Sequence, residues 1–257
     1  KWYIGTLMAD GSILLIYLGG IRAMGTQWAR VTAELHRPGK DMVKGCTPAR
    51  FVRGGGRVLQ CGSARIDRDK LYFETPELSG QLTFNPRYPP TQIKEALLED
   101  GDRKIQWYVE IPDADVEGRI TWPGGYQDIA GRGFRDRVYY DMLPWRPHFK
   151  ELRWGRAITE NHAAIWMEGQ TPKGFFRATW HNGNIYASDQ PLVQMQDMRT
   201  ISRSDVVTLS GLHLGLARPL LSKLSGHPIE IKQAGKAVLH SEVGVCIIGD
   251  LRWGEEL

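Results

Sequence analysis

Residues 175–186 read FFRATWHNGNIY and place two strand-like runs on either side of Asn182-Gly183. Aromatic and β-branched residues, which favour strands, are frequent in both runs. Both central residues of a type I′ turn adopt positive φ angles, and Asn followed by Gly tolerates these angles well. The stretch therefore predicts an antiparallel β-hairpin.

Alternation of apolar and polar residues recurs along the chain, notably in residues 29–35 (ARVTAEL) and 105–111 (IQWYVEI). A half-buried strand has this period of two, because successive side chains point to opposite faces. Short strands separated by turns are typical of an antiparallel sandwich or barrel. Turn-forming residues occur at Asp10-Gly11, Pro38-Gly39, Gly54-Gly55-Gly56, Asn85-Pro86, Pro89-Pro90 and Pro123-Gly124-Gly125.

Two short helices are also predicted. Residues 91–100 suit the first, because Thr91 can cap its start, an apolar stripe begins at Ile93 and Gly101 can end it. The second covers residues 219–224. All other regular structure is expected to be strand.

The composition is that of an ordinary globular protein, with 42% hydrophobic and 24% charged residues in a chain of 257. This length fits one large β domain or two smaller ones. Positive and negative residues nearly balance, at 33 against 29, and they are interleaved. Nucleic-acid binding usually concentrates positive charge in one segment, so no nucleic-acid partner is expected.

Cysteine usage favours a reducing compartment and hence the cytoplasm. The three cysteines are odd in number and form no C-x-x-C pair, although a single bridge between Cys46 and Cys61 stays open. The longest apolar stretch, residues 13–18, is far shorter than the roughly 20 residues of a membrane-spanning helix. No membrane span is expected.

Several familiar sites are not predicted. Residues 113–118 (DADVEG) imitate the start of a calcium loop, but Gly124 stands where a bidentate Glu is needed, so a solvated turn is expected. The Gly54-Gly55-Gly56 run lacks the following helix of a phosphate loop and is interpreted as a turn. The histidines show no metal-ligand spacing, so no metal is expected; they are His36, His148, His162, His181, His213, His227 and His240.

Residues 122–156 (WPGGYQDIAGRGFRDRVYYDMLPWRPHFKELRWGR) stand out, because they combine three aspartates and six arginines with many aromatic residues. Such a segment can be an edge strand and an exposed loop with ordinary salt bridges. It can also form the wall of a binding pocket, in which aromatic rings shape an apolar cavity and a carboxyl group holds or delivers a proton.

Two blocks of sequence resemble the carotenoid 1,2-hydratase (hydroxyneurosporene synthase) and AttH-like family. Residues 1–18 (KWYIGTLMADGSILLIYL) are similar to its first block, and residues 131–136 (GRGFRD), followed by Leu143-Pro144 and residues 154–156 (WGR), are similar to its second. The resemblance implies an all-β fold of two lipocalin-like (calycin) antiparallel barrels with few short helices. We expect them to cover residues 1–130 and 131–257.

The resemblance also implies a class of function. Relatives of this fold include tocopherol cyclase-like proteins and lipocalin-like pericyclases (Diels-Alderases) that form rings in polyketides. We therefore expect a cofactor-independent cyclase, isomerase or hydratase acting on an apolar polyene, a polyketide or isoprenoid intermediate, as a monomer or homodimer. Phe134 and Arg135 stand where the family usually has Tyr and His, so the scaffold carries over better than the hydration reaction.

Asp136 is the expected acid or orienting carboxylate, because burial among Tyr139, Tyr140 and Trp154 would favour its protonated form. A pairing with Arg135 or Arg137 would instead make it a structural anchor. The expected catalytic residues are Asp136, Asp128 and Tyr139. The expected substrate-binding residues are Trp2, Tyr3, Trp28, Trp122, Tyr126, Arg135, Tyr140, Trp154, Trp166 and Trp180.

Two other classes of function stay open. A non-catalytic carrier of a hydrophobic small molecule would line its barrel with apolar groups and a few neutral donors. An interaction module would place arginines and aromatic rings on an open sheet face. An inward-facing carboxyl at Asp136 or Asp128 distinguishes a proton-transferring enzyme from both.

Overall fold

The computed structural model describes residues 1–23, 26–49, 52–55, 58–100, 103–140, 151–171, 174–186, 193–205 and 229–252. These residues form antiparallel strands and contain no helix, which confirms the predicted all-β class. Within the same ranges, no helix has the length and apolar composition to cross a membrane. The chain divides into two compact units, which are described separately.

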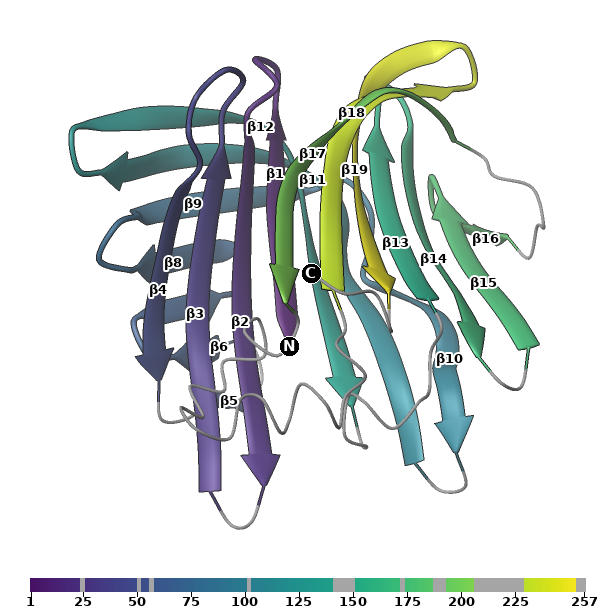
Figure 1. Cartoon of the computed structure of the whole chain (residues 1–257), viewed down its shortest axis with the longest axis horizontal. Helices are drawn as coiled ribbons and strands as arrows, with labels where there is room; N and C mark the ends of the chain where they lie inside the picture. Colours follow the sequence, from purple (N-terminus) through teal and green to yellow (C-terminus); the bar gives the residue numbers. More distant parts are fainter. Residues whose placement is uncertain are drawn as a thin grey trace. The chain divides into compact units, whose positions relative to one another are not determined.

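Sheet A is a twelve-stranded antiparallel sheet that curls into a nearly closed barrel (Figure 1). The strand order is β4-β3-β2-β1-β12-β11-β9-β8-β7-β6-β5. The twelfth strand, β10, is not part of this order and pairs with β11. Its strands are β1 (Trp2–Met8), β2 (Ile13–Ala23), β3 (Thr26–His36), β4 (Val43–Ala49), β5 (Val52–Gly55), β6 (Val58–Cys61), β7 (Ala64–Asp67), β8 (Lys70–Glu74), β9 (Ser79–Pro86), β10 (Thr91–Asp100), β11 (Arg103–Trp122) and β12 (Gly125–Tyr140).

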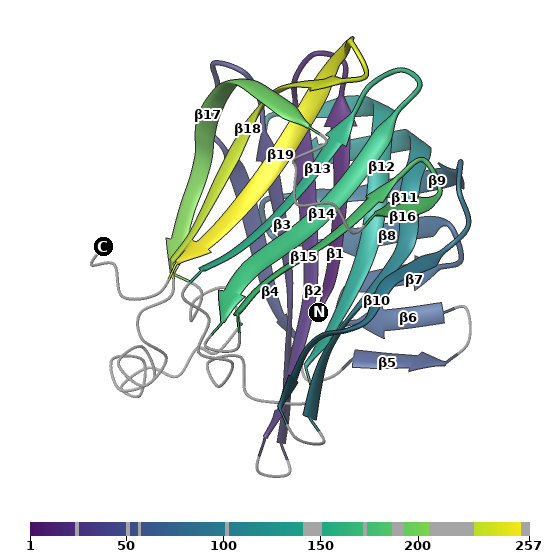
Figure 2. The ribbon, with the colours of Figure 1, turned by 90° about the vertical axis from the view of Figure 1, so that its right-hand side faces the viewer.

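Sheet B has seven antiparallel strands in the order β16-β15-β14-β13-β19-β18-β17 (Figure 2). Its strands are β13 (Glu151–Ile158), β14 (Ala163–Thr171), β15 (Gly174–His181), β16 (Asn184–Tyr186), β17 (Gln194–Asp205), β18 (Ile229–Leu239) and β19 (Glu242–Arg252). The predicted hairpin at Asn182-Gly183 joins β15 to β16, and both turn residues have positive φ, 44° and 90°.

The two units are discontinuous in sequence. Unit 1 comprises Lys1–Thr91 and Val109–Val138, and unit 2 comprises Gln92–Tyr108 and Tyr139–Leu257. The sequence-based division at residues 130 and 131 falls inside β12, whereas the units separate after Val138. Strand β12 runs without a break through the boundary proposed from the sequence.

The core of unit 1 forms on one face of sheet A. Ile4, Leu14, Ile16 and Val31 are fully buried there, and Trp2 and Trp122 pack against the same cluster. The register places Ile4 opposite Ile16, and every second residue of β1, β2 and β3 faces this cluster. The alternation seen in the sequence therefore identifies the core-facing positions correctly.

The core of unit 2 is built around Trp166, which is 9% exposed and packs with alanine, valine, leucine and isoleucine side chains. Trp166 lies opposite Gly155 of β13. A Cβ at Gly155 would overlap the Trp166 ring, so only glycine leaves room for this indole. On the other face of the sheet, Gly249 leaves room for the ring of Trp154 in the same way.

Two local predictions are wrong. Residues 91–100 form strand β10 and not a helix, because pairing with β11 overrides a helical pattern that rests on few apolar residues. Residues 113–118 lie inside β11 and not in a solvated turn, and Asp113 is fully buried beside Arg132. Gly54 and Gly55 belong to β5, while the predicted helix at residues 219–224 lies outside the described residues.

All three cysteines are free thiols, so the Cys46–Cys61 bridge does not form. Burial raises the pKa of Cys61 to about 11 and that of Cys246 to about 12. Cys46 is only partly buried, and its sulfur accepts a hydrogen bond from Nε of Arg30.

Alkylation with iodoacetamide at pH 8 is therefore expected to modify Cys46 first, and Cys61 and Cys246 only after unfolding. Peptide mass mapping measures this order, and equal modification of all three in the folded protein would contradict it. Because the raised pKa keeps both buried thiols neutral, their contribution to stability is present below pH 9 and is lost as the pH rises toward 12.

Candidate functional site

Four neighbouring strands of unit 1, in the order β3-β2-β1-β12, bring polar side chains into one row. Thr32 pairs with Tyr17, Tyr17 with Tyr3, and Tyr3 with Asp136. Directly opposed residues in a sheet point to the same face, so these four side chains are neighbours. We call Thr32, Tyr17, Tyr3 and Asp136 the polar row.

The polar row lies on the face of sheet A opposite the core cluster, because its residues alternate with Ile4, Ile16 and Val31. Each of its residues is nevertheless at most 8% exposed. The hydroxyl oxygens of Tyr3 and Tyr17 and Oδ1 of Asp136 are all buried atoms. A carboxyl group and two phenols therefore share surroundings from which water is largely excluded.

Aromatic packing fixes the position of the central residue of the row. The ring of Tyr3 contacts that of Tyr17, with a centroid distance of 5.0 Å, and stacks on that of Phe134 at 5.5 Å. Phe134 lies opposite Gly5, and a Cβ at Gly5 would overlap its ring. Gly5 therefore allows Phe134 to lie against the sheet and to support Tyr3.

A second polar group occupies the same face at β3 and β4. Glu34 is fully buried, and its Oε1 is 2.8 Å from Nζ of Lys44. Nε2 of His36 is 3.6 Å from Oε2 of the same carboxylate. Glu34 lies opposite Leu15, one row away from the polar row on this face. This carboxylate is ion-paired, which makes it a worse proton donor than a carboxyl group in neutral surroundings.

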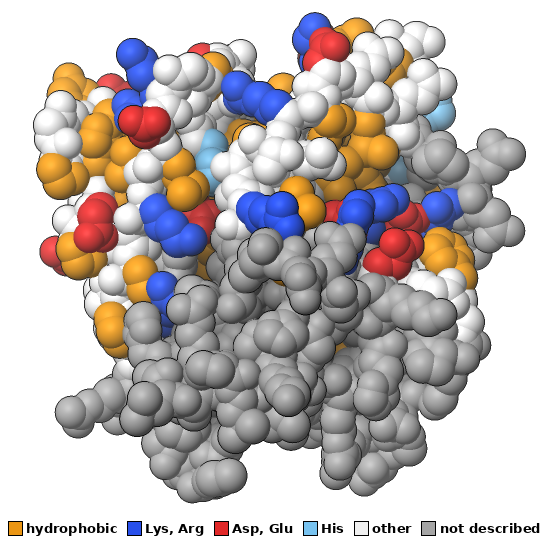
Figure 3. Space-filling view, in the orientation of Figure 1, with side chains coloured by type: hydrophobic (Ala, Val, Ile, Leu, Met, Phe, Trp, Pro, Cys, Tyr) orange, Lys and Arg blue, Asp and Glu red, His pale blue; other side chains and the backbone are white. Residues whose placement is uncertain are grey.

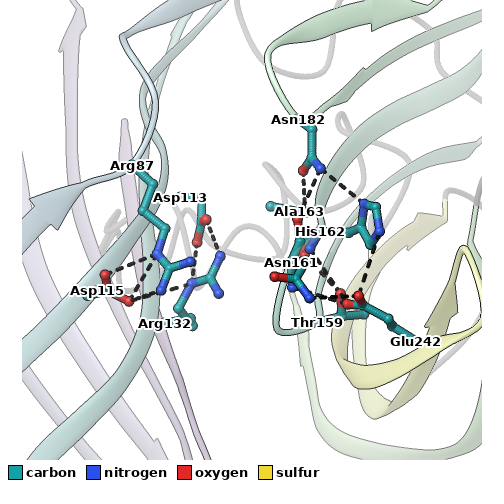
Figure 4. A network of polar contacts seen from close by, with 10 residues as sticks. All are labelled: Arg87, Asp113, Asp115, Arg132, Thr159, Asn161, His162, Ala163, Asn182 and Glu242. Carbon is teal, nitrogen blue, oxygen red and sulfur yellow. Dashed lines mark hydrogen bonds and ion pairs between the residues drawn. The ribbon is translucent and has the colours of Figure 1, made fainter.

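Arg132 and Asp113 form a further buried pair, in which Nε of Arg132 donates to Oδ1 of Asp113 at 2.9 Å (Figure 4). Arg87 donates to the neighbouring carboxylate of Asp115, and this hydrogen bond lowers the pKa of Asp115. Each carboxylate in this network faces a guanidinium. The network therefore serves to fix β11 and β12 and not to transfer protons.

The arginines beside Asp136 in sequence point to the other face of β12. Nε of Arg135 is 2.9 Å from Oε2 of Glu110, and Nε of Arg137 is 3.9 Å from Oε1. Nε1 of Trp2 donates to the same carboxylate at 3.3 Å. Glu110 is thus the partner of both arginines, and Trp2 and Arg135 lie in a charged cluster beside the core, away from the polar row.

Two other expected residues of unit 1, Asp128 and Tyr126, are exposed, and a third, Trp122, lies at the edge of the core. Asp128 is 65% exposed, and its hydrogen bond from Arg119 lowers its pKa, the opposite of what an acid at neutral pH needs. Tyr126 is also exposed and lies beneath the Arg119 guanidinium. Trp122 is half-buried, with the guanidinium of Arg37 4.6 Å from its ring centroid.

In unit 2, Tyr139 is exposed, whereas Trp166 and Trp180 are buried. Nε1 of Trp154 is 3.4 Å from Oε1 of Glu230, to which it donates. The side chains of Trp28 and Tyr140 lie outside the described part of the structure, although both residues belong to strands.

Alternating charges cross four strands of sheet B. Asp250 pairs with Arg153, Arg153 with Glu168, and Glu168 with Arg177, on β19, β13, β14 and β15. The closest nitrogen–oxygen distance is 3.5 Å between Arg153 and Asp250 and 3.4 Å between Arg153 and Glu168. It is 2.6 Å between Arg177 and Glu168. We call Asp250, Arg153, Glu168 and Arg177 the charge ladder. It lies on the same face as Trp166, because Gly155 and Arg153 are two residues apart.

Three solved structures share this architecture across nearly the whole chain. A candidate AttH protein from Nitrosomonas europaea matches with a TM-score of 0.66 at 12% identity, over 98% of this chain and 91% of that one. CghA matches with a TM-score of 0.59 at 12% identity, over 100% and 88%. Kievitone hydratase from Nectria haematococca matches with a TM-score of 0.58 at 11% identity, over 98% and 88%.

The chain has the fold of these proteins. The lipocalin-like fold expected from the resemblance in residues 1–18 and 131–156 is thereby confirmed. A scan against protein-family models and a search of curated proteins found no match. The likeness to solved structures therefore gives the fold of this chain.

Tyr3 and Asp136 of the polar row were among the residues predicted from the sequence, whereas Tyr17 and Thr32 were not. Tyr17 stands in the apolar run ILLIYL, where a tyrosine resembles an ordinary core residue. Thr32 alternates with apolar residues and therefore resembles a solvent-facing position. The turn at Asp10-Gly11 is a signal that could have identified Tyr17, because it sets which residues of the two flanking strands lie opposite each other and so pairs Tyr17 with Tyr3.

Proposed function

We propose that the chain is a cofactor-independent enzyme that protonates or polarises an apolar, unsaturated small molecule, and so acts as a hydratase, cyclase or isomerase. The observation that carries this proposal is the polar row, where Asp136 lies beside the buried phenol of Tyr3, which in turn contacts the ring of Tyr17. The name of kievitone hydratase, a structural neighbour, is in keeping with addition of water on this scaffold.

The chemistry follows from the surroundings of the row. Exclusion of water favours the protonated form of a carboxyl group and strengthens its hydrogen bonds. A protonated Asp136 can donate its proton to an alkene carbon or to a carbonyl oxygen. The resulting cation accepts either water or a second double bond of the same molecule. The Asp136 carboxylate then takes a proton back from the added water, or from a carbon next to the new cation, which gives the neutral hydrated or cyclised product and restores the acid. The phenols of Tyr3 and Tyr17 can hold a substrate oxygen during this step.

Phe134 gives the row an apolar neighbour. Its ring is fully buried and stacks on Tyr3, so aromatic carbon and not water packs beside the acid. An apolar polyene loses little by leaving water and gains from ring contact. Positioning of a flexible polyene in a reactive shape adds to the effect of proton transfer.

Isotope incorporation tests this proposal. The protein is incubated with acyclic isoprenoid polyenes and with linear polyene ketones, in D₂O and separately in H₂¹⁸O, and the products are analysed by mass spectrometry. Protonation of carbon by Asp136 is expected to introduce one deuterium, and hydration is expected to introduce ¹⁸O as well. Products with neither isotope would assign a pericyclic or purely positional role.

A carrier gives a different result in the same experiment. It would bind a polyene, seen as quenching of tryptophan fluorescence, and would release it unchanged and unlabelled. An interaction module would bind neither class of polyene. On the face seen in Figure 3, positive and negative side chains of the described residues are mixed, which does not favour a surface for nucleic acid.

A further inference from the structure

Three histidines of unit 2 meet at one end of sheet B. His162 lies in the turn between β13 and β14, His181 ends β15, and His240 lies in the turn between β18 and β19. Their ring centroids are 4.8 to 5.3 Å apart. One nitrogen of each ring can be chosen so that all three lie within 4.8 Å of one another.

His240 lies in a tight two-residue hairpin turn. His240 and Ser241 both have positive φ angles, 47° and 72°, between the paired residues Leu239 and Glu242. Two positive φ angles are typical of a type I′ turn, and histidine is among the residues other than glycine that adopt them more often. This short turn places the His240 ring beside His162 and His181.

We propose that His162, His181 and His240 bind a divalent transition-metal ion of the zinc class. Nε2 of His181 and Nδ1 of His162 are 3.3 Å apart. Two nitrogen ligands, each about 2.0–2.1 Å from a tetrahedral zinc ion, are separated by about 3.4 Å. This pair therefore already has the spacing of two ligands, and His240 must approach to complete the set.

Small ring rotations complete the site. The interplanar angles between the three rings are 20–32°, so the rings are nearly parallel. In a metal site, the lone pair of each ligand nitrogen lies in its ring plane and points at the ion, so the rings must turn toward a common point. His181 is buried and keeps its place, while His162 is partly exposed and His240 is exposed. The two accessible rings can thus turn about the bond from Cβ to the ring without disturbing the core.

Glu242 supports the choice of ligand atom on His162. Its Oε1 is 3.9 Å from Nε2 of His162, and its other contacts are with Thr159 and Asn161 (Figure 4). A carboxylate that faces one ring nitrogen commonly orients a histidine whose other nitrogen binds a metal. Nδ1 of His162 is therefore the ligand atom, and it faces Nε2 of His181.

Asn182 competes for the same atom. Its Nδ2 is 3.0 Å from Nδ1 of His162, so binding of a metal ion would replace this contact. Asn182 would stay in place, because its Oδ1 accepts a hydrogen bond from the backbone of Ala163 and its Nδ2 donates to the carbonyl of Asn161. The hydrogen bond between Nε2 of His181 and Nδ1 of His162 would be replaced as well. Three metal–nitrogen bonds would replace these two contacts.

The ligand set selects the kind of ion. Three imidazoles suit Zn²⁺, Co²⁺, Ni²⁺ and Cu²⁺, whereas Mg²⁺ and Ca²⁺ prefer oxygen ligands. A tetrahedral ion with three protein ligands keeps its fourth position for water or another small ligand.

Titration of the metal-free protein tests the proposal. Calorimetry with ZnCl₂ is expected to show one equivalent bound, and CoCl₂ is expected to give the intense visible bands of a tetrahedral ion. MgCl₂ should give no heat. The variant His240→Ala is expected to weaken zinc binding at least 100-fold, and Glu242→Gln is expected to weaken it about 10- to 100-fold.

The variant His36→Gln is the matched control, because it removes a histidine from unit 1, where the ring faces Glu34. It should keep one equivalent of zinc. Circular dichroism confirms that each variant is folded, and His162→Ala repeats the test from another turn. Zinc binding that survives in both His240→Ala and His162→Ala, or an octahedral cobalt spectrum in the parent protein, would overturn the proposal.

Discussion

Asp136→Asn is expected to lower the turnover number about 10²- to 10⁴-fold for any polyene that the protein converts, with a small change in KM. This range is what one positioned proton donor contributes to catalysis. The amide keeps the shape of the side chain opposite Tyr3 and removes the acidic proton. Steady-state kinetics and loss of deuterium incorporation measure the effect.

Asp128→Asn is the matched control for this prediction. Asp128 belongs to the same strand, yet its carboxylate is exposed and paired with Arg119. Its replacement is expected to leave turnover unchanged and to alter stability little, since exposed ion pairs contribute little. Equal activity of the parent protein and Asp136→Asn would remove the acid role, provided that both melt at similar temperatures.

Gly155→Ala is expected to destabilise the protein by about 1–3 kcal/mol, the usual cost of an extra methyl group in a packed core. The new Cβ would overlap the ring of Trp166, which is a rigid side chain in the centre of the unit 2 core. Urea denaturation, monitored by fluorescence, measures the free energy of unfolding.

A double-mutant cycle makes this second prediction specific. In the background of Trp166→Leu, Gly155→Ala is expected to cost much less, because the ring that it overlaps is absent. Gly19→Ala is the control, since nothing lies within 4 Å of the position of its Cβ. It should be neutral or stabilise slightly by reducing the freedom of the unfolded chain. A cost for Gly155→Ala that is the same in both backgrounds would contradict the overlap with Trp166.

The all-β class could be predicted from the sequence because alternation and turn residues are local signals. The stretch 105–111 shows this directly: Ile105, Trp107, Val109 and Ile111 are buried, as their spacing predicts. Alternation gave a wrong prediction of exposure where both faces of a strand are buried. Thr32, Glu34 and His36 alternate with apolar residues and therefore resembled a solvent-facing edge, yet all three are buried.

The candidate sites depend on contacts between distant parts of the sequence. Tyr3 and Asp136 become neighbours only through the pairing of β1 with β12, which no local pattern reports. Spacing likewise excluded a metal site, because His162, His181 and His240 come from separate turns. Asp136 could be predicted because it stands in a recognisable sequence block. Tyr17 could be recognised as a neighbour of Tyr3 only from the register of β1 and β2.

The charge ladder has a consequence for folding fidelity. If β13 slipped by two residues against β19, Arg153 would face Ile248 or Arg252 in place of Asp250. The same slip against β14 would place Arg153 opposite Trp166 or Gln170, and Glu168 would keep only Arg177 as its partner. Misaligned strands would thus leave the partly exposed Arg153 without its two carboxylates, so the ladder favours the native alignment of β13 over these slips.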